Sequence, residues 1–281
     1  MQSIDPSYLK PRLLKRDNES HKGNYGHLLL VCGCQRMPGA AVLATGAALH
    51  SGCGLVTLHS TARALQAVVN NYPSAMLSED PFEYFSVLPE SLERYNCIAA
   101  GPGLGRTRQT EEVLYQLICA ASARNIPMVL DADALNALAA HPDWRPDLPA
   151  GSVLTPHLGE LRRLSPGEDR PEAAARRLAE ETGCIIIMKG YHSSIFSPES
   201  AVLVNSTGNP GMAKGGSGDV LTGLVGGLIA RGYAPFDAAA LGVWIHGYAG
   251  DCLTEERTAE GYSSRDLVDS LWKGFKQLNT F

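Results

Sequence analysis

Short apolar runs alternate with longer segments of helical pattern along most of the chain. The run at 184–188, Cys-Ile-Ile-Ile-Met, has no polar alternation and is typical of a strand buried on both faces. Segment 171–182 instead carries alanines on one side and charges on the other, as an amphipathic helix does. Further strands are expected at 27–32, 54–58, 97–100, 127–130 and 152–155, and further helices at 39–49, 110–124, 219–229 and 237–253. Strands alternating with helices predict an α/β fold with a mainly parallel central sheet and helices on both faces.

This alternation continues through the chain without a repeat, a low-complexity tract or a linker. We therefore predict a single domain over residues 1–281, with residues 1–26 as an irregular N-terminal arm. In open parallel sheets, ligands bind beyond the carboxyl ends of the strands. That rule selects five segments: Gly101–Gly105, Asp131–Asn136, Thr155–Glu160, Lys189–Ser193 and the glycine-rich stretch 207–219.

Composition narrows the classes of partner. The formal charge is −5 and the pI about 5.9, so there is no general attraction to nucleic acid or to anionic lipid. The N-terminus lacks an apolar signal core, and no apolar run reaches the length of a membrane span. The seven cysteines include no C-x-x-C pair and are expected to be free thiols. We expect a soluble cytoplasmic protein that binds neither nucleic acid nor membrane.

The stretch 205–223, N-S-T-G-N-P-G-M-A-K-G-G-S-G-D-V-L-T-G, carries the strongest chemical signal. Glycines before a helix expose backbone amides that can hold phosphate oxygens, so Gly215, Gly216, Ser217 and Gly218 form a candidate anion hole. Asp219 falls in the first helical turn, where the helix dipole stabilises a carboxylate. It can act there as a base beside a bound phosphoryl group. A tight glycine turn capped by an aspartate is the structural alternative.

The block G-N-P-G-M-A-x-G-G-S-G-D-V-L-T-G resembles the signature of the ADP/ATP-dependent NAD(P)H-hydrate dehydratases, members of the ribokinase-like superfamily. Segments along nearly the whole chain resemble this family in the same order. They are K-G-N-Y-G at 22–26, M-P-G-A-A at 37–41, S-G-C-G-L-V-T at 51–57, G-P-G-L-G at 101–105, D-A-D-A-L-N at 131–136 and T-P-H-L-G-E at 155–160.

The resemblance implies repair of hydrated nicotinamide cofactors. The substrate would be NADHX or NADPHX, in which the reduced ring carries a hydroxyl group. ADP or ATP would phosphorylate that hydroxyl, Asp219 would take its proton, and loss of phosphate would restore NADH or NADPH. The stand-alone form of the chain favours ADP. Catalysis of this kind rests on positioning and electrostatics.

The same resemblance assigns the remaining site residues. Ala40, Gly103, His157 and Asp219 would contact the substrate. Glu160 would organise Mg²⁺ through water, because this ion keeps several waters and few protein ligands. The nucleotide would be held by Lys189, Gly190, Tyr191, His192, Ser193 and Gly218. A homotetramer and a functional link to a separate epimerase, which interconverts the two hydrate epimers, are also implied. Helices of small residues, such as the one at 237–250, are candidates for packing between subunits.

Several residues depart from the pattern or keep a structural reading. Lys214 stands where a small residue is expected; it either adds positive charge near the phosphates or points to solvent. Asp133 is expected to cap a helix and Asp131 to shape the site entrance. His246, in an apolar run, is expected to pack within the core.

Two other functions fit part of the pattern. A kinase of the same superfamily, acting on a hydroxymethylpyrimidine, a thiazole alcohol or pyridoxal, would share the glycine and Asp219 elements. Such kinases often have T-P-N-x-x-E where this chain has His157. A nucleotide-binding protein without catalysis is the second alternative, and the intact Asp219 counts against it.

Overall fold

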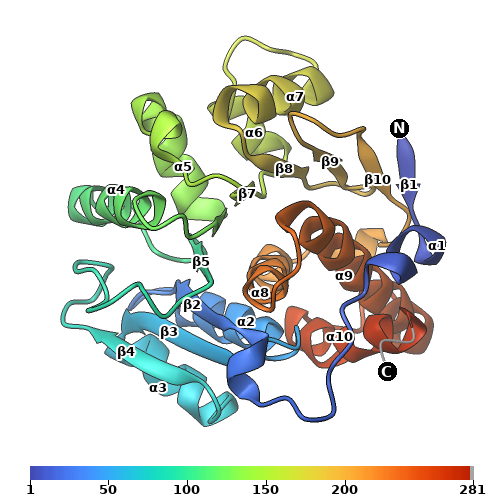
Figure 1. The fold of residues 1–281 in the computed structure, drawn as a ribbon, viewed down its shortest axis with the longest axis horizontal. Helices are drawn as coiled ribbons and strands as arrows, with labels where there is room; N and C mark the ends of the chain where they lie inside the picture. The colour runs from blue at the N-terminus through green and yellow to red at the C-terminus, as the bar shows by residue number, and fades with distance from the viewer. Residues whose placement is uncertain (279–281) are drawn as a thin grey trace.

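A ten-stranded sheet forms the centre of the computed structural model, which describes residues 1–278 (Figure 1). Its strand order is β1-β10-β9-β8-β7-β6-β5-β2-β3-β4. Only β9 runs antiparallel to its neighbours, so the predicted mainly parallel sheet is confirmed. The strands are β1 Gln2–Ile4, β2 His27–Val31, β3 Leu55–Thr61, β4 Met76–Asp80, β5 Cys97–Ala100, β6 Met128–Leu130, β7 Val153–Leu154, β8 Ile185–Met188, β9 Ser194–Phe196 and β10 Leu203–Asn205.

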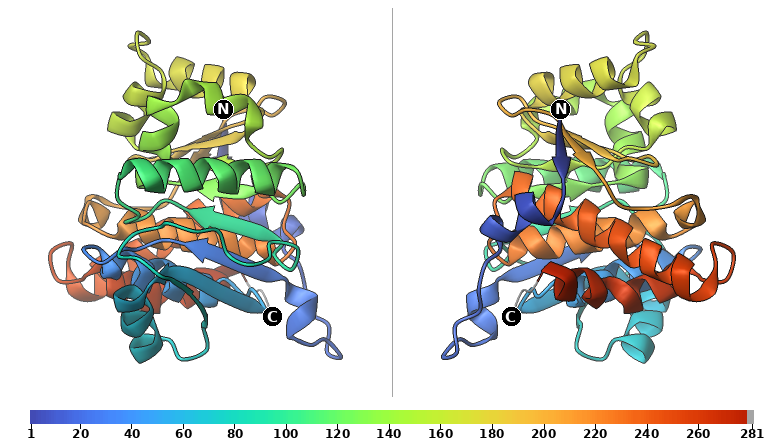
Figure 2. Two further views of the ribbon diagram at one scale, coloured as in Figure 1. Left: turned by 90° about the vertical axis from the view of Figure 1, so that its left-hand side faces the viewer. Right: turned by 90° about the vertical axis from the view of Figure 1, so that its right-hand side faces the viewer.

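Helices cover both faces of the sheet, as the two side views in Figure 2 show: α4 faces the viewer in one, and α9 and α10 in the other. One face carries α1 Pro6–Leu9, α2 Pro38–Leu49, α3 Ala62–Asn71, α8 Ser217–Ala230, α9 Pro235–Arg257 and α10 Ser264–Leu278. The other carries α4 Arg108–Ser122, α5 Ala132–Ala140, α6 Leu158–Leu164 and α7 Pro171–Thr182. Short 3₁₀ turns lie at Lys10–Arg12, Lys22–Tyr25, Pro142–Asp147 and Pro210–Met212.

The apolar strands contribute side chains to two hydrophobic cores, one on each face of the sheet. Leu28 and Leu30 of β2 belong to the core under α2 and α8, whereas Leu29 and Val31 belong to the core under α4 and α5. Successive side chains of a strand point to opposite faces of the sheet. A strand with helices on both sides must therefore be apolar at every position, which explains the uninterrupted runs in the sequence.

Three features differ from the sequence-based expectations. The first 26 residues are not wholly irregular, because they include β1, which pairs with β10, and the short helix α1. Helix α8 begins at Ser217, two residues earlier than expected, so Asp219 lies within its first turn. The small residues of α9, expected to pack between subunits, are instead buried in this chain's own core from Ala238 to Ile245.

No helix within residues 1–278 is long and apolar enough to cross a membrane.

Candidate active site

Four of the predicted ligand-binding segments follow neighbouring parallel strands. Gly101 follows β5, Asp131 follows β6, Thr155 follows β7 and Lys189 follows β8. Because the carboxyl ends of parallel strands share one edge of the sheet, these segments come together there. The fifth segment joins them: a Cβ placed on Gly218 would lie 3.3 Å from Lys189 Nζ and 3.4 Å from Asp131 Oδ2. The site is therefore assembled from four strand exits and the N-terminus of α8.

The glycine block sets the backbone at the start of α8. Gly216, the residue before the helix, has φ +91°, a left-handed conformation that favours glycine, and a Cβ there would approach Leu43 Cδ1 to 2.3 Å. The amide of Ser217 donates to the carbonyl of Lys214 at 3.3 Å. Those of Gly218 and Asp219 lie in the first turn, where no intrahelical acceptor is available. They point to an anion site at the positive end of the helix.

Asp219 lies close to the other charged groups of the site. Burial raises the pKa of its carboxyl to about 6; the negative charges of Asp131 and Asp133 add to this rise, and Lys189 opposes it. An aspartate with a pKa near neutrality is ionised at physiological pH and can still accept a proton readily. This is the property that a general base requires.

Lys189 is the cation at the centre of the site. Its Nζ donates to Asp131 Oδ1 at 2.6 Å and lies 3.8 Å from Glu160 Oε2. Burial alone would lower the pKa of Lys189, but the carboxylates of Asp131 and Glu160 raise it, so the ammonium stays charged.

Asp131 is 1% exposed and saturated by partners, because its second oxygen accepts from Thr222 Oγ1 at 2.8 Å. Burial would raise the pKa of Asp131, yet Lys189 and the hydrogen bonds lower it. Asp131 therefore holds Lys189 in place rather than shaping the entrance. Asp133 is not a helix cap: Asp131 occupies the cap position of α5, and Asp133 accepts from the amide of Gly105 at 2.9 Å.

His157 and Glu160 form a reciprocal cap at the start of α6. The ring nitrogen Nδ1 of His157 accepts from the amides of Gly159 and Glu160, and Glu160 Oε2 accepts from the amide of His157 at 2.8 Å. Because Nδ1 is an acceptor, the ring proton of the neutral imidazole lies on Nε2. The His157 side chain is 53% exposed, so it can donate from Nε2 to a ligand. The structural and the functional readings of His157 are thus compatible.

Ala40 and Gly103 meet at the side of the site nearest β2. Gly103 has φ +63°, and a Cβ there would lie 2.9 Å from Ala40 Cβ and 3.0 Å from Met37 Cβ. Ala40 belongs to the first turn of α2 and Gly103 to the loop after β5. The absence of a Cβ at Gly103 therefore lets the loop after β5 pack against the first turn of α2.

The loop after β8 carries the predicted nucleotide residues. Tyr191 is 63% exposed and its ring lies 4.1 Å from that of His192. Nδ1 of His192 lies 3.2 Å from the carbonyl of Asn205, and Ser193 Oγ contacts the backbone of Gly190. A Cβ on Gly208 would lie 3.9 Å from the carbonyl of Tyr191. The loop therefore adjoins both β10 and the N-terminal half of the glycine-rich segment.

Two anchors of that segment were missed in the sequence. Asp251 of α9 accepts from the amide of Gly208 at 2.9 Å and from Asn209 Nδ2 at 2.8 Å. His246 Nε2 lies 3.0 Å from the carbonyl of Ser217. Burial lowers the pKa of His246 to about 4, so it is neutral and donates this bond. Asp251 and His246 are polar residues within otherwise apolar helices, as is Thr222 of α8. This pattern was the sequence signal that could have identified all three as hydrogen-bonding anchors.

Lys214 does neither of the two things expected of it. Its Nζ donates to the carbonyls of Ala259 and Tyr262 and lies over the Tyr262 ring, 3.9 Å from the centroid. The side chain thus ties the glycine-rich segment to the loop between α9 and α10.

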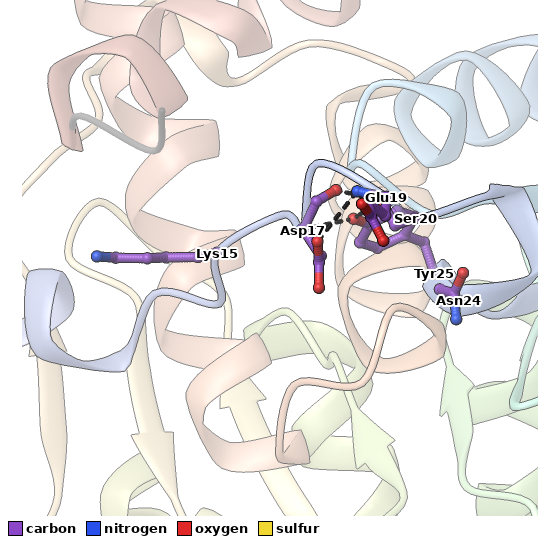
Figure 3. Close-up of a pocket in the computed structure, with 6 residues that line it drawn as sticks. All are labelled: Lys15, Asp17, Glu19, Ser20, Asn24 and Tyr25. Atoms are coloured by element: carbon purple, nitrogen blue, oxygen red, sulfur yellow. Dashed lines mark hydrogen bonds between the residues drawn. The ribbon is translucent and has the colours of Figure 1, made fainter.

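A surface pocket lies at the other end of α8. It is lined by Lys15, Asp17, Glu19, Ser20, Asn24 and Tyr25, with Lys15 pointing away from the hydrogen-bonded turn at Asp17–Ser20 (Figure 3). Its position follows from Gly26, where a Cβ would lie 1.8 Å from the carbonyl of Ala230 at the C-terminal end of α8. Since Asp219 is at the N-terminal end, this pocket is not part of the candidate site.

The described residues contain no cluster of side chains arranged to coordinate a metal ion. Across 1–278 no group of three or more His, Cys, Asp or Glu side chains has a suitable arrangement. All seven cysteines are free.

Comparison with known proteins agrees with this architecture. The sequence family described as NAD(P)H-hydrate dehydratase matches residues 28–273. The ADP-dependent (S)-NAD(P)H-hydrate dehydratase of Neisseria meningitidis is 37% identical, over 87% of this chain and 83% of that protein. The bifunctional NAD(P)H-hydrate repair enzyme of Moorella thermoacetica is 38% identical over 95% of this chain, which spans about half (52%) of that longer relative.

Solved structures show the same relationship. The ADP/ATP-dependent NAD(P)H-hydrate dehydratase of Bacillus subtilis, co-crystallised with ATP and Mg²⁺, superposes with a TM-score of 0.84 at 29% identity, covering 99% of this chain and 98% of that one. A hydroxyethylthiazole kinase from Pyrococcus horikoshii, at 15% identity and a TM-score of 0.63, shares the fold alone. The extent of the sequence match and the identity to the Neisseria protein lead to one conclusion: the chain belongs to the NAD(P)H-hydrate dehydratase family.

Proposed function

We propose that the chain dehydrates the (6S) hydrates of NADH and NADPH at the expense of ADP or ATP, and is therefore a carbon–oxygen lyase that repairs nicotinamide cofactors. One observation carries the proposal: Asp219, with a pKa raised to about 6, stands in the first turn of α8 beside amides without intrahelical acceptors and next to Lys189. A base, an anion site and a buried cation in one place are the parts that phosphoryl transfer to a hydroxyl group needs.

The substrate would enter between Ala40, Gly103 and His157. Nε2 of His157 carries the ring proton on a side chain that is 53% exposed, so it can donate to an acceptor on the hydrated nicotinamide. Asp219 would take the proton of the ring hydroxyl as the phosphoryl group is transferred. The amides of Gly215, Gly216 and Gly218 would hold the negative charge on the phosphoryl oxygens, since that of Ser217 already donates to the carbonyl of Lys214. Loss of phosphate from the ring, together with a proton from the neighbouring ring carbon, then restores the reduced cofactor.

The nucleotide would lie along the loop Lys189–Ser193 and Gly218. Gly190 is open, since a Cβ there would meet no atom within 4 Å, and the exposed Tyr191 offers a flat face to a base. Lys189 brings positive charge to the phosphates from the position in which Asp131 holds it.

Mg²⁺ fits this charge balance. The single ammonium of Lys189 faces the carboxylates of Asp131, Glu160 and Asp219, so nucleotide phosphates would add to an existing excess of negative charge. Glu160 Oε1 lies towards the exposed ring of His157, 3.4 Å from Nε2, and accords with a contact to the ion through water. When bound, the ion would supply positive charge to the phosphate oxygens.

The chain would act in the cytoplasm, which its free cysteines support, and a separate epimerase would supply the (6S) epimer. We also propose a homotetramer, whose contacts would come from exposed apolar side chains such as Trp272 and Met76, and not from α9. Light scattering on the purified chain tests the tetramer.

Product analysis tests the reaction. The protein is incubated with NADHX, Mg²⁺ and ADP or ATP, and the products are followed by phosphorus NMR. We expect inorganic phosphate and NADH in equal amounts with loss of one phosphate from the nucleotide. A stable phosphorylated organic product, formed from a vitamin-type alcohol instead, would indicate the kinase. Nucleotide binding without any turnover would indicate the non-catalytic alternative.

A further inference from the structure

The candidate active site continues along the strand exits beyond Gly103. The amide of Gly33, after β2, donates to the carbonyl of Pro102 at 2.8 Å, and its carbonyl accepts from Ser60 Oγ of β3 at 3.2 Å. The amide of Gln35 donates to the carbonyl of Glu83, in the loop after β4, at 3.0 Å. Hydrogen bonds therefore link the exits of β5, β2, β3 and β4 into one surface, whose inner end is the Gly103–Ala40 contact.

Two arginines without partners lie on this surface. Arg36 adjoins Gln35 in the loop before α2, and Arg63 lies in the first turn of α3, directly after β3. Both are exposed, and neither side chain forms an ion pair or a hydrogen bond with any residue in 1–278. In contrast, the nearby arginines of α4 and its preceding loop are paired, Arg108 with Glu112 and Arg106 with Glu111. The dipole of α3 disfavours a cation at its N-terminal end. Their free guanidinium groups suit an anionic ligand.

The loop at 81–88 holds an aromatic pair on either side of Glu83, whose carbonyl accepts from the amide of Gln35 beside Arg36. Phe82 is 55% exposed, and its ring lies 6.1 Å from that of Tyr84 at an interplanar angle of 22°. The hydroxyl of Tyr84 donates to Gln109 Oε1 of α4 at 2.8 Å, and Figure 1 shows this loop extending from β4 towards α4. An exposed stacked pair is a platform for a planar ring.

A buried polar network fixes the loop in this position. The carboxylate of Asp80, 1% exposed, accepts from the amides of Phe82, Ser86 and Val87 and from Ser86 Oγ. The buried His59 ring contacts Ser78 Oγ and the carbonyl of Val87. A buried carboxylate is costly unless it is fully hydrogen-bonded, and here four of the bonds come from the loop, while His59 Nε2 lies 3.5 Å from Asp80 Oδ2. The network holds the Phe82 side chain exposed to solvent. Burial of apolar surface cannot explain this position, because the ring of Phe82 is not buried.

We propose that Arg36 and Arg63 bind the pyrophosphate of the substrate, and that the Phe82–Tyr84 pair stacks on its adenine ring. The inference rests on the proposed function, in which the hydrated nicotinamide lies between Gly103 and Asp219. A dinucleotide held there must extend its pyrophosphate and adenosine along one of the neighbouring surfaces. Guanidinium groups match phosphate oxygens in a two-pronged geometry, and aromatic rings stack on any base. The surface thus offers a binding partner both to the pyrophosphate and to the adenine ring of the substrate.

Truncation of the substrate tests this arrangement. The variants Arg36→Ala, Arg63→Ala and Phe82→Ala are assayed with NADHX and with the hydrate of reduced nicotinamide mononucleotide, which lacks adenosine monophosphate. Arg108→Ala serves as the control, since it removes an exposed arginine that is paired. Each arginine variant should raise KM for NADHX about tenfold while changing kcat less than about twofold. Kinetic constants with the mononucleotide should equal those of the unmodified protein, as should both sets for Arg108→Ala.

Equal losses with both substrates, or an unchanged KM for NADHX in both arginine variants, would overturn the inference. A change of oligomeric mass in Phe82→Ala with KM unaltered would also overturn the aromatic part and make the pair a subunit contact. Failure of the unmodified protein to convert NADHX would refute the proposed function instead. In that case, calorimetric binding of NAD⁺ and of nicotinamide mononucleotide still decides the inference: the arginine variants should weaken only the former.

Discussion

The ammonium of Lys189 lies 2.6 Å from Asp131 Oδ1, and Asp131 is in turn fixed by Thr222 of α8. This contact joins the strand exits of β6 and β8 to the helix that carries Asp219. It also sets the balance of charge around Asp219, because Asp131 raises the pKa of that carboxyl and Lys189 lowers it.

Replacing Asp131 with Asn should therefore affect both stability and the pH profile. Loss of one partner from a buried ion pair is expected to reduce the free energy of unfolding by about 3 kcal/mol. Removal of the negative charge at Asp131 should lower the pKa of Asp219, so the acidic limb of the kcat/KM profile should move to lower pH. Denaturant unfolding and a pH profile measure the two effects. Asp133→Asn is the matched control for stability, with a smaller loss of about 1 kcal/mol from the bond to Gly105. Its acidic limb should move in the same direction but less, because the charge of Asp133 raises the pKa of Asp219 less than that of Asp131 does. An unshifted limb in Asp131→Asn would contradict this account of the charge balance.

The unmodified protein should lose activity as pH falls through about 6. Asp219 must be ionised to accept a proton, and its pKa is raised to about 6, so the active fraction declines below that value. Well below it, kcat/KM should drop by roughly tenfold per pH unit. Initial rates between pH 5 and pH 8 at saturating nucleotide test this. A profile that stays flat down to pH 5 would show that Asp219 is not the titrating base.

Stability should also fall in the same direction, through His27. This side chain is 6% exposed, and burial, aided by the charge of Arg94, lowers its pKa to about 4 from the ordinary histidine value of 6.5. Below about pH 6.5 the His27 side chain of the unfolded chain binds a proton, whereas that of the folded chain does so only near pH 4. The free energy of unfolding therefore declines between these two pH values by up to about 3 kcal/mol. His27→Gln should flatten this decline when unfolding is measured at several pH values, whereas His50→Gln, at the exposed end of α2, should not. Identical pH dependence in His27→Gln and the unmodified chain would refute the prediction.

The close approach of Gly103 and Ala40 can be separated from backbone strain. Gly103→Ala places a Cβ 2.9 Å from Ala40 Cβ in a left-handed conformation, whereas Gly105→Ala, at φ +80°, meets no atom within 4 Å. Both should lose about 1–2 kcal/mol of stability from the left-handed backbone. Only Gly103→Ala should also raise KM for the substrate, and Ala40→Gly combined with it should restore part of the loss. Equal KM values for the two glycine variants would place the substrate elsewhere.

The sequence predicted the fold and most of the candidate site for definite physical reasons. The run at 184–188 was identifiable because a strand between two helix layers must be apolar throughout, and β8 is such a strand. The strand exits could be placed together because parallel strands end at one edge. The ordered family motifs then indicated candidate site residues, such as His157, that the hydrophobic periodicity alone does not reveal.

What the sequence did not reveal depends on contacts between distant segments. Asp131 and Thr222 are 91 positions apart, and only the packing of α8 against the sheet brings them together. Lys214 could not be assigned because its partners, the carbonyls of Ala259 and Tyr262, belong to a turn whose path is set by α9 and α10. In both cases a polar side chain finds a partner through tertiary structure, for which local sequence gives no rule.

The most direct test of the central claim is absorbance at 340 nm after the protein is mixed with NADHX, Mg²⁺ and either ADP or ATP, with Asp219→Asn measured in parallel. We expect a nucleotide-dependent rise for the unmodified protein and a rate at least about a thousandfold lower for Asp219→Asn, with nucleotide binding retained. A rise of equal rate in Asp219→Asn, or no rise in a folded protein that binds nucleotide, would contradict it.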